Sequence, residues 1–409
     1  MYANDSMSAY LSAAEAAAEL GVNLPTLYAY VSRGLIRSEA GGGSRRRRYL
    51  AEDIWVLKQR KQHRRDPGKA AREALHWGLP VLESRLSVIH DGRLFYAGRD
   101  VVTLAQSCSI EQVAALLWMG DLHAPFPDDY LVVPEWKTVA GVAAALPPLE
   151  GLQLFLPVAA SHDPYAYDTR PAAVQRAGAR ILRLLAAAVV RTRPSRDPIA
   201  RVLQRRWAPA DAGVARLLQA ALVLYADNGL NPSSFTARCV ASAGSTPYAL
   251  VAAGLAALQG SKHGGACERA QGLLDEVREA RGAQRAVMAR MRRGEAVPGF
   301  GHPLYPEGDP RGAYLMQLVA EARPKSPEVK LALALTAAVR ELMDDHPTVD
   351  FGVVTLCRAL DLPSAAALSL LGVGRVVGWI AHGLEQYQEG REIRPRARYA
   401  GDLPRGERR

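Results

Sequence analysis

The sequence predicts a mainly helical protein, with one small β-hairpin in its larger part and a winged helix-turn-helix unit at its start. Three observations lead to this prediction. Apolar residues recur at helical spacing over most of the chain after residue 80. The clearest strand signal is a hairpin over Leu86–Tyr96, where Asp91-Gly92 supplies the tight turn. Near the N-terminus, two short segments carry helix caps and are separated by a glycine-containing turn.

Composition places the chain among ordinary globular proteins. Its 409 residues are enough for two or three folding units. Hydrophobic residues make up 49% and charged residues 22%, which excludes a disordered chain. We expect a winged helix-turn-helix domain over residues 1–65, a linker over 66–80 and a larger domain over 81–409.

The chain is expected to be cytoplasmic and to have no membrane partner. Its four cysteines form no Cys-x-x-Cys pair, so the sequence encodes neither a disulfide framework nor a zinc site, as is typical of a reducing compartment. The segment Met1–Tyr10 has no basic residue and does not resemble a secretory signal. The stretch Cys239–Ser261 is free of charge for 23 residues but includes serine, glycine and proline. We interpret it as a buried helix reached through a polar loop.

The first expected element is a helix over Ser12–Leu20. Its serine is placed to cap it, a glutamate follows at the capping-box spacing, and Gly21 ends it. A second helix over Asn23 to about Arg33 has an asparagine as its cap. Two short helices joined by a three-residue turn with a glycine are typical of a helix-turn-helix.

A basic β-hairpin, the wing, is expected after the second helix. Gly41–Gly43 is followed by Arg45–Tyr49, and a third helix is expected over Ala51 to about Arg64. Residues 33–65 hold eleven lysines and arginines against three acids, whereas residues 1–32 hold three acids and no base. A basic block of this kind favours a polyanionic partner. The alternative interpretation is a solvated basic tail.

The segments LPTLYAYVSRGLI and SRRRRYLAEDI resemble the winged helix-turn-helix of the mercury-resistance-regulator (MerR-type) and excisionase-like family. The resemblance implies that the second helix enters the major groove of DNA and that the wing contacts phosphates or the minor groove. The DNA-binding residues that it implies are Thr26, Tyr28, Tyr30, Arg33, Arg45, Arg46, Arg47 and Arg48.

The larger domain is expected to be built from helices. Val214–Tyr225 carries apolar residues at the spacing of a helix with one buried face. A further helix is expected to begin after Ser326-Pro327. Proline-rich loops over residues 124–134 and 194–210 are expected to interrupt the helices.

Of the nine histidines, His263 and His302 stand in segments with two glycines each, KHGG and GFGH. Glycine lets a ligand approach the backbone closely, and an imidazole can give and take a proton near neutral pH. A single histidine of this kind is more often structural than functional. The role of each one therefore has to be judged from the surrounding sequence.

Seven segments between about Val81 and Arg398 resemble the citrate synthase family and follow the order of that family. They are SRLSVIHDGRLFYAGRD, LNPSSFTARCVAS, LQGSKHGGACE, GFGHPLYPEGDPR, HPTVDFG, RVVGWIAHGLEQ and RPRARY. The resemblance implies a helical fold with a small subdomain, residues 262–362, inserted in a large one. It also implies the condensation of acetyl-CoA with oxaloacetate to citrate and CoA, with 2-methylcitrate synthesis from propionyl-CoA as an alternative.

The same resemblance implies the catalytic groups. Removing a proton from the methyl group of a thioester needs a base together with a donor to the developing enolate oxygen. Asp350 is implied as that base and His263 as the donor to the thioester oxygen. His302 is implied as the group that polarises the ketone of the oxo acid.

The substrate-binding residues are also implied by the resemblance. Fixed guanidinium groups suit the carboxylates of an oxo acid. The implied positions are Arg311, Arg375 and Arg394 for the carboxylates, with Asn228 and Asn231 in the oxo-acid segment, and Arg394 reaches in from the second subunit of a homodimer. The loops that would bind CoA contain Gly264, Gly299, Phe300 and Gly301. The resemblance implies no metal and no permanently bound cofactor.

The chain departs from the family pattern at some of these positions. Asn228 and Gly229 stand where the family has histidine and glutamate, and Pro303 and Pro306 replace basic residues of the loop after His302. Asn228 keeps a hydrogen-bond donor but removes a cation, a loss expected to cost about 1.5–3 kcal/mol of oxo-acid binding.

Two functions therefore stay open. One is an active synthase whose helix-turn-helix ties it to DNA or serves assembly. The other is a transcriptional regulator whose synthase domain senses acyl-CoA, oxo acid or citrate without turnover. The retained His263, His302 and Asp350 favour the enzyme, because sensing needs no base. Asn228 and the basic wing favour the regulator.

Overall fold

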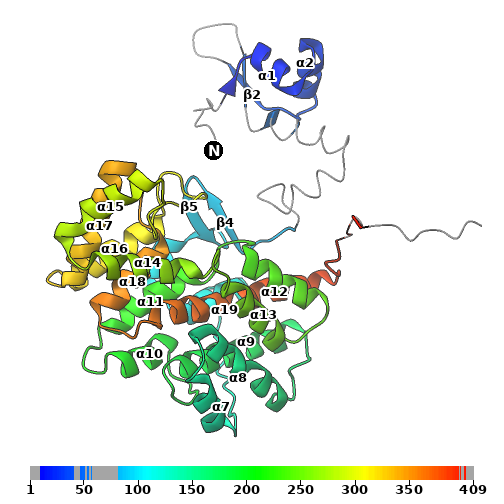
Figure 1. The fold of residues 1–409 in the computed structure, drawn as a ribbon. Coiled ribbons are helices and arrows are strands. Elements are labelled where there is room, and N and C mark those ends of the chain that lie inside the picture. Colours follow the sequence, from blue (N-terminus) through cyan, green and yellow to red (C-terminus); the bar gives the residue numbers. More distant parts are fainter. Residues whose placement is uncertain are drawn as a thin grey trace, which may run out of the picture. The chain divides into compact units, whose positions relative to one another are not determined.

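The computed structural model of the protein describes residues 10–40, 47–50, 53–54, 57, 82–395, 397 and 400–401 (Figure 1). The chain divides into two compact units, Met1–Glu83 and Ser84–Arg409. Each unit has its own hydrophobic core. The predicted linker, residues 66–80, lies outside the described residues.

The two N-terminal helices have the caps that the sequence predicts. Helix α1 covers Ala13–Leu20. Its N-cap Ser12 donates its backbone N–H to Glu15 at 2.8 Å and accepts from the backbone N–H of Glu15 at 3.3 Å, which completes the capping box. Helix α2 covers Leu24–Ser32, and its N-cap Asn23 accepts from the backbone N–H of the third residue on at 3.0 Å. Both predicted helices are confirmed.

The predicted wing is an antiparallel pair of strands, β2 (Ser38–Ala40) and β3 (Arg47–Leu50). A short strand β1 (Tyr10–Leu11) pairs with the other edge of β3 and makes a three-stranded sheet. Strand β1 was not predicted because two residues are too few to show an alternating pattern. Among the residues described in this unit, those that form its buried core are Ala16, Ala17, Leu20, Leu27, Ile36, Tyr49 and Ile54.

Part of the predicted N-terminal unit lies outside the described residues. Arg45 and Arg46 belong to this part, as does most of the third helix predicted over 51–64. The described residues of that segment, Asp53, Ile54 and Leu57, are helical.

The second unit is mainly helical, as predicted, with one small sheet. The sheet has the order β4 (Ser87–His90), β5 (Arg93–Tyr96), β6 (Arg99–Asp100), and its first two strands form the predicted hairpin. The first helices are α5 (Val101–Ser107), α6 (Ile110–Met119), α7 (Trp136–Ala143), α8 (Pro148–His162), α9 (Pro171–Val189), α10 (Ile199–Trp207), α11 (Val214–Tyr225), α12 (Pro232–Ser242) and α13 (Pro247–Leu258). The later ones are α14 (Gly265–Val277), the short 3₁₀-helix Ala280–Gly282, α15 (Ala283–Arg293), α16 (Pro310–Ala322), α17 (Pro327–Met343), α18 (Val349–Ala359) and α19 (Ala366–Glu389).

Helix α19 lies at the centre of this unit. It packs against α6, α9, α11, α12 and α13, and Figure 1 shows it as the orange-red helix among the green ones. Within the described ranges it is the one helix long and apolar enough to cross a membrane, but 94% of its apolar window is buried inside the protein. Its apolar character therefore fits a core helix.

The predictions for two segments differ in outcome. The proline-rich segment 194–210 was predicted to be a loop, and this is wrong, because α10 lies within it. Pro198 is the N-cap of this helix and Pro209 follows its end, positions that a helix tolerates. The stretch Cys239–Ser261 contains the end of α12, a short loop and the buried helix α13, as its polar composition predicts.

Helices α16 and α18 approach each other closely at two glycines. A Cβ atom on Gly312 would lie 2.3 Å from the carbonyl oxygen of Pro347, and one on Gly352 would lie 2.8 Å from the Cβ of Leu315. Since such distances exclude any side chain, the two glycines set the separation of the helices. The helix N-termini are thereby brought together, with Asp350 at the start of α18.

Candidate active site

Asp350 is the second residue of α18 and is held by two other helices. The hydroxyl of Tyr225, at the end of α11, donates to its Oδ1 at 2.9 Å. The thiol of Cys267, near the start of α14, donates to the same oxygen at 3.3 Å. Helices α11, α14 and α18 therefore meet at one carboxylate oxygen.

His263 lies in the loop between α13 and α14 and is neutral at pH 7. Burial, assisted by the charge of Arg375, lowers its pKa to about 4. Its Nε2 lies 2.8 Å from Oγ of Ser233 on α12. A neutral imidazole has one donor and one acceptor nitrogen.

His302 is held in one tautomer by the backbone. The N–H of Leu304 donates to its Nδ1 at 3.2 Å, so the proton of the neutral ring is on Nε2. Burial lowers the pKa of His302, and the positive charge of Arg311 lowers it further. Gly301 precedes it with φ of 73°. A Cβ atom there would lie 2.4 Å from Oδ2 of Asp345, so this turn requires glycine.

Arg311 is a buried guanidinium group with a fixed carboxylate partner. Its Nε and Nη2 donate to the two oxygens of Asp309 at 2.9 and 3.0 Å. Asp309 also accepts from the backbone N–H of Val349 at 3.0 Å, which ties the start of α16 to the start of α18. Nη1 of Arg311 donates to Oδ1 of Asn228 at 3.3 Å. Asn228 thus contacts the arginine whose role in binding the oxo acid is implied by the family resemblance.

Arg375 is a buried guanidinium group of a different kind. It lies on α19 and is 5% exposed, and its Nε and Nη1 have no hydrogen-bond partner within the described chain. Burial lowers its pKa, although the negative charge of Asp227 opposes this. A buried cation without a hydrogen-bonded partner is costly, so the arrangement suits an anionic ligand that supplies the missing acceptors.

The charges of these groups act on one another. Arg311 and Asp350 both affect the pKa of His302, and Arg375 affects that of His263. The charges of Arg311 and Asp350 also act on the pKa of Arg375, which links the two histidines, Asp350 and the two buried arginines in one site.

The remaining predicted residues have other positions. Asn231 is the N-cap of α12 and accepts from Ser233 and Ser234, while its buried Nδ2 has no partner in the described part of the chain. Arg394 is exposed beyond the end of α19, and the described residues give it no ion pair. The ring of Phe300 packs on Phe351 at 4.6 Å, and the backbone N–H groups of Phe300 and Gly301 donate to Val297 and His346.

Sequence reasoning missed several side chains of this site. Tyr225 was assigned to the apolar stripe of α11, although its hydroxyl contacts Asp350. Cys267 and Asp309 lie within the matched segments, at short distances in sequence from His263 and Arg311. That nearness was a usable signal, whereas nothing in the sequence linked Tyr225 to Asp350, 125 residues away.

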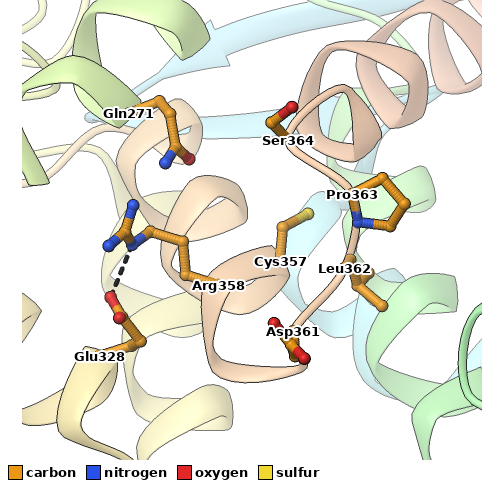
Figure 2. A pocket seen from close by; sticks show the side chains of 8 residues that line it. All are labelled: Gln271, Glu328, Cys357, Arg358, Asp361, Leu362, Pro363 and Ser364. Carbon is orange, nitrogen blue, oxygen red and sulfur yellow. Dashed lines mark hydrogen bonds and ion pairs between the residues drawn. The ribbon is translucent and has the colours of Figure 1, made fainter. Parts of the chain in front are cut away.

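A separate cavity of about 230 Å³ lies between α14, α17 and the segment that joins α18 to α19. Figure 2 shows Arg358 bonded to Glu328 on one side of it and Cys357 facing it. None of the predicted site residues lines this cavity, so it is not the predicted site. Among the described residues there is also no group of three or more metal-ligating side chains.

In the N-terminal unit, four of the six described side chains predicted to bind DNA are exposed. On α2, Tyr28 is 50% exposed and Thr26 and Tyr30 are half-buried. Arg33 at the end of α2 and Arg47 and Arg48 on β3 are exposed.

The buried cations, neutral imidazoles and carboxylate suit a protein class that performs acid–base chemistry on a small anionic ligand. Residues 74–396 match the family model described as the citrate synthase C-terminal domain. The chain therefore belongs to the citrate synthase family and is a transferase of that type. Residues 10–60 match a helix-turn-helix domain.

Relatives and solved structures agree with this assignment. The chain is 31% identical to a citrate synthase of Haloferax volcanii over 80% of this chain and 94% of the relative. It is 28% identical to a 2-methylcitrate synthase of Shewanella oneidensis over 76% and 90% of the two chains. The crystal structure of citrate synthase from Thermotoga maritima covers 80% of this chain and 95% of its own, at 26% identity and a TM-score of 0.67.

Proposed function

We propose that the protein condenses acetyl-CoA with oxaloacetate and releases citrate and CoA. The unpartnered guanidinium nitrogens of Arg375 carry this proposal, because a buried cation beside a second one, Arg311, fits an oxo acid with two carboxylates. Bidentate carboxylate binding would supply the acceptors that Arg375 lacks.

Three side chains have roles in this proposal. Asp350 takes a proton from the methyl group of the thioester, and the imidazole of His263 donates to the thioester oxygen, which stabilises the enol. The enol carbon attacks the ketone carbon of oxaloacetate while Nε2–H of His302 donates to the ketone oxygen. Water then cleaves the thioester to give citrate and CoA. The lowered pKa values of both histidines support this scheme, because neutral imidazoles act as donors without competing with the arginines for the carboxylates.

Binding of CoA is proposed at the backbone of the loops that hold Gly264 and Gly299–Gly301. Arg394 is proposed to complete the site of the second subunit of a homodimer, and its exposure on the single chain supports this. We also propose that residues 262–362 form a small subdomain inserted in the larger one.

The acyl substrate is acetyl-CoA or propionyl-CoA. The second alternative has support from the relative named 2-methylcitrate synthase. The test is release of free CoA by the purified protein with acetyl-, propionyl- and butyryl-CoA, each with oxaloacetate and with 2-oxoglutarate. We expect release with oxaloacetate and one of the two shorter acyl groups. Absence of release from every pair would contradict the proposal and favour a metabolite sensor.

A second function, DNA binding, is proposed for the N-terminal unit. The exposed Tyr28 and the exposed Arg33, Arg47 and Arg48 support it, because aromatic and guanidinium groups on a helix and a wing suit the grooves and phosphates of DNA. The test is binding of the full chain to the DNA upstream of its own gene at several salt concentrations. We expect affinity to fall steeply with salt. Equal affinity at low and high salt would contradict the proposal.

A further inference from the structure

Asp350 presents its two carboxylate oxygens to different surroundings. Oδ1 accepts from Tyr225 at 2.9 Å and from Cys267 at 3.3 Å. Among the described residues no donor is directed at Oδ2. We propose that Tyr225 and Cys267 are positioning residues, which hold Oδ1 so that Oδ2 is the oxygen that takes the substrate proton. This inference rests on the proposed role of Asp350 as the base.

The two donors form a rigid support. The Tyr225 hydroxyl and the Cys267 sulfur are 3.5 Å apart, so with Oδ1 they make a closed triangle. Tyr225 is fully buried and Cys267 is 2% exposed. Since they come from α11 and α14, the carboxylate on α18 is fixed from two directions that its own helix does not supply.

Both groups keep their protons and therefore act as donors. Burial raises the pKa of Tyr225 and of Cys267 well above their ordinary values, and the charge of Asp350 raises them further. An ionised carboxylate only accepts hydrogen bonds, so each donor stabilises its charged form. The hydroxyl is the stronger donor, because a thiol is a weak one.

The first test is the pH dependence of kcat/KM for the acyl-CoA in Tyr225→Phe and Cys267→Ala. Losing a donor disfavours the charged carboxylate, so more alkaline conditions are needed to ionise it. We expect the acidic limb of the profile to move to higher pH by about one unit in Tyr225→Phe and by less in Cys267→Ala. Cys267→Ser, which restores a donor, should return the limb toward the wild-type position.

Matched controls exist elsewhere in the same unit. Tyr248 is also buried and donates to a carboxylate, that of Asp163, at 2.8 Å. Cys357 is a buried thiol on α18 that has no hydrogen bond to Asp350. Tyr248→Phe and Cys357→Ala should leave the acidic limb where it is. An unchanged limb in both test variants, with turnover present, overturns the positioning inference and leaves the proposed function intact.

A second measurement does not need turnover. The S–H stretching band of Cys267, found in the Raman spectrum by its loss in Cys267→Ala, reports the hydrogen bond directly. We expect Asp350→Ala to move this band to the position of a free thiol. If the wild type shows no turnover, the proposed function is contradicted. The S–H band still tests whether Cys267 donates to Asp350, because its measurement needs no turnover. A band that does not respond to Asp350→Ala overturns the inference.

Discussion

The two units of the molecule use arginine in opposite ways. In the N-terminal unit, Arg33, Arg47 and Arg48 are exposed on a short helix and a hairpin. In the second unit, Ser84–Arg409, here called the synthase unit, Arg311 and Arg375 are 1% and 5% exposed and lie on helices. An exposed guanidinium group keeps its water and attracts any polyanion, with an affinity that salt reduces. A buried guanidinium group has lost its hydration shell, and its position and orientation are fixed. It therefore favours an anion of matching shape bound in one position.

The largest effect is expected for Asp350→Ala, which should change CoA release and leave DNA binding as it is. Asp350→Ala should reduce CoA release about 10⁴-fold, because the proposed base is lost. Binding of DNA by the same variant should be unchanged, since Asp350 belongs to the other unit. Parallel measurements of CoA release and DNA affinity test this, and a joint loss of both would show that the units do not act separately.

Replacement of the two buried arginines should have different effects on the free energy of unfolding. Arg311→Leu leaves the carboxylate of Asp309 buried without its partner and should lower the free energy of unfolding by about 3 kcal/mol. Arg375→Leu removes a cation with two unpartnered nitrogens, so the ligand-free protein should be as stable as the wild type. Both should lose about a hundredfold or more in kcat/KM for the oxo acid. Urea unfolding and steady-state kinetics check this, and equal destabilisation by both would contradict the contrast.

Burial of His263 should make the synthase unit sensitive to acid. Its pKa is about 4 in the folded protein, against an ordinary value of 6.5. Between these values the unfolded chain binds the additional proton, so the free energy of unfolding should fall as the pH drops from 6.5 to 4, by about 3 kcal/mol at most. His263→Gln should flatten this part of the stability curve. His90→Gln, at an exposed position, is the control and should leave the curve unchanged.

The exposed arginines should affect only DNA binding. Arg47→Ala combined with Arg48→Ala should weaken DNA binding about tenfold at moderate salt and reduce the slope of log affinity against log salt by about two. The rate of CoA release should not change. A titration at three salt concentrations measures both quantities, and an unaltered slope would remove β3 from the proposed interface.

The smallest expected effect concerns the neighbour of Arg311. Asn228→His should lower the KM for the oxo acid by up to about tenfold, because an imidazolium can give a charge-assisted hydrogen bond to a carboxylate. Steady-state kinetics with the oxo acid varied is the measurement. A higher KM would mean that the bond between Asn228 and Arg311 serves a different substrate.

Local features were predictable from the sequence. The caps at Ser12 and Asn23 and the hairpin turn at Asp91-Gly92 each depend on a few adjacent residues. The helix inside 194–210 was missed because its prolines were taken as breaks, although they flank the helix.

The composition of the site was predictable only in part. Resemblance led to Asp350 and the histidines, but the partners of Asp350 come from α11 and α14 through contacts that no sequence period describes. Likewise, the sequence does not show that Arg311 has a carboxylate partner and that two nitrogens of Arg375 have none. Such differences depend on which helices meet in space.

The carboxylate of Asp309 couples Arg311 to the start of α18. It holds Arg311 by two bonds and the backbone of Val349 by a third, and Asp350 is the next residue along the chain. A force applied to the guanidinium group is therefore transmitted to the first turn of α18. An oxo acid bound to Arg311 would therefore act, through Asp309, on the residue next to the proposed base.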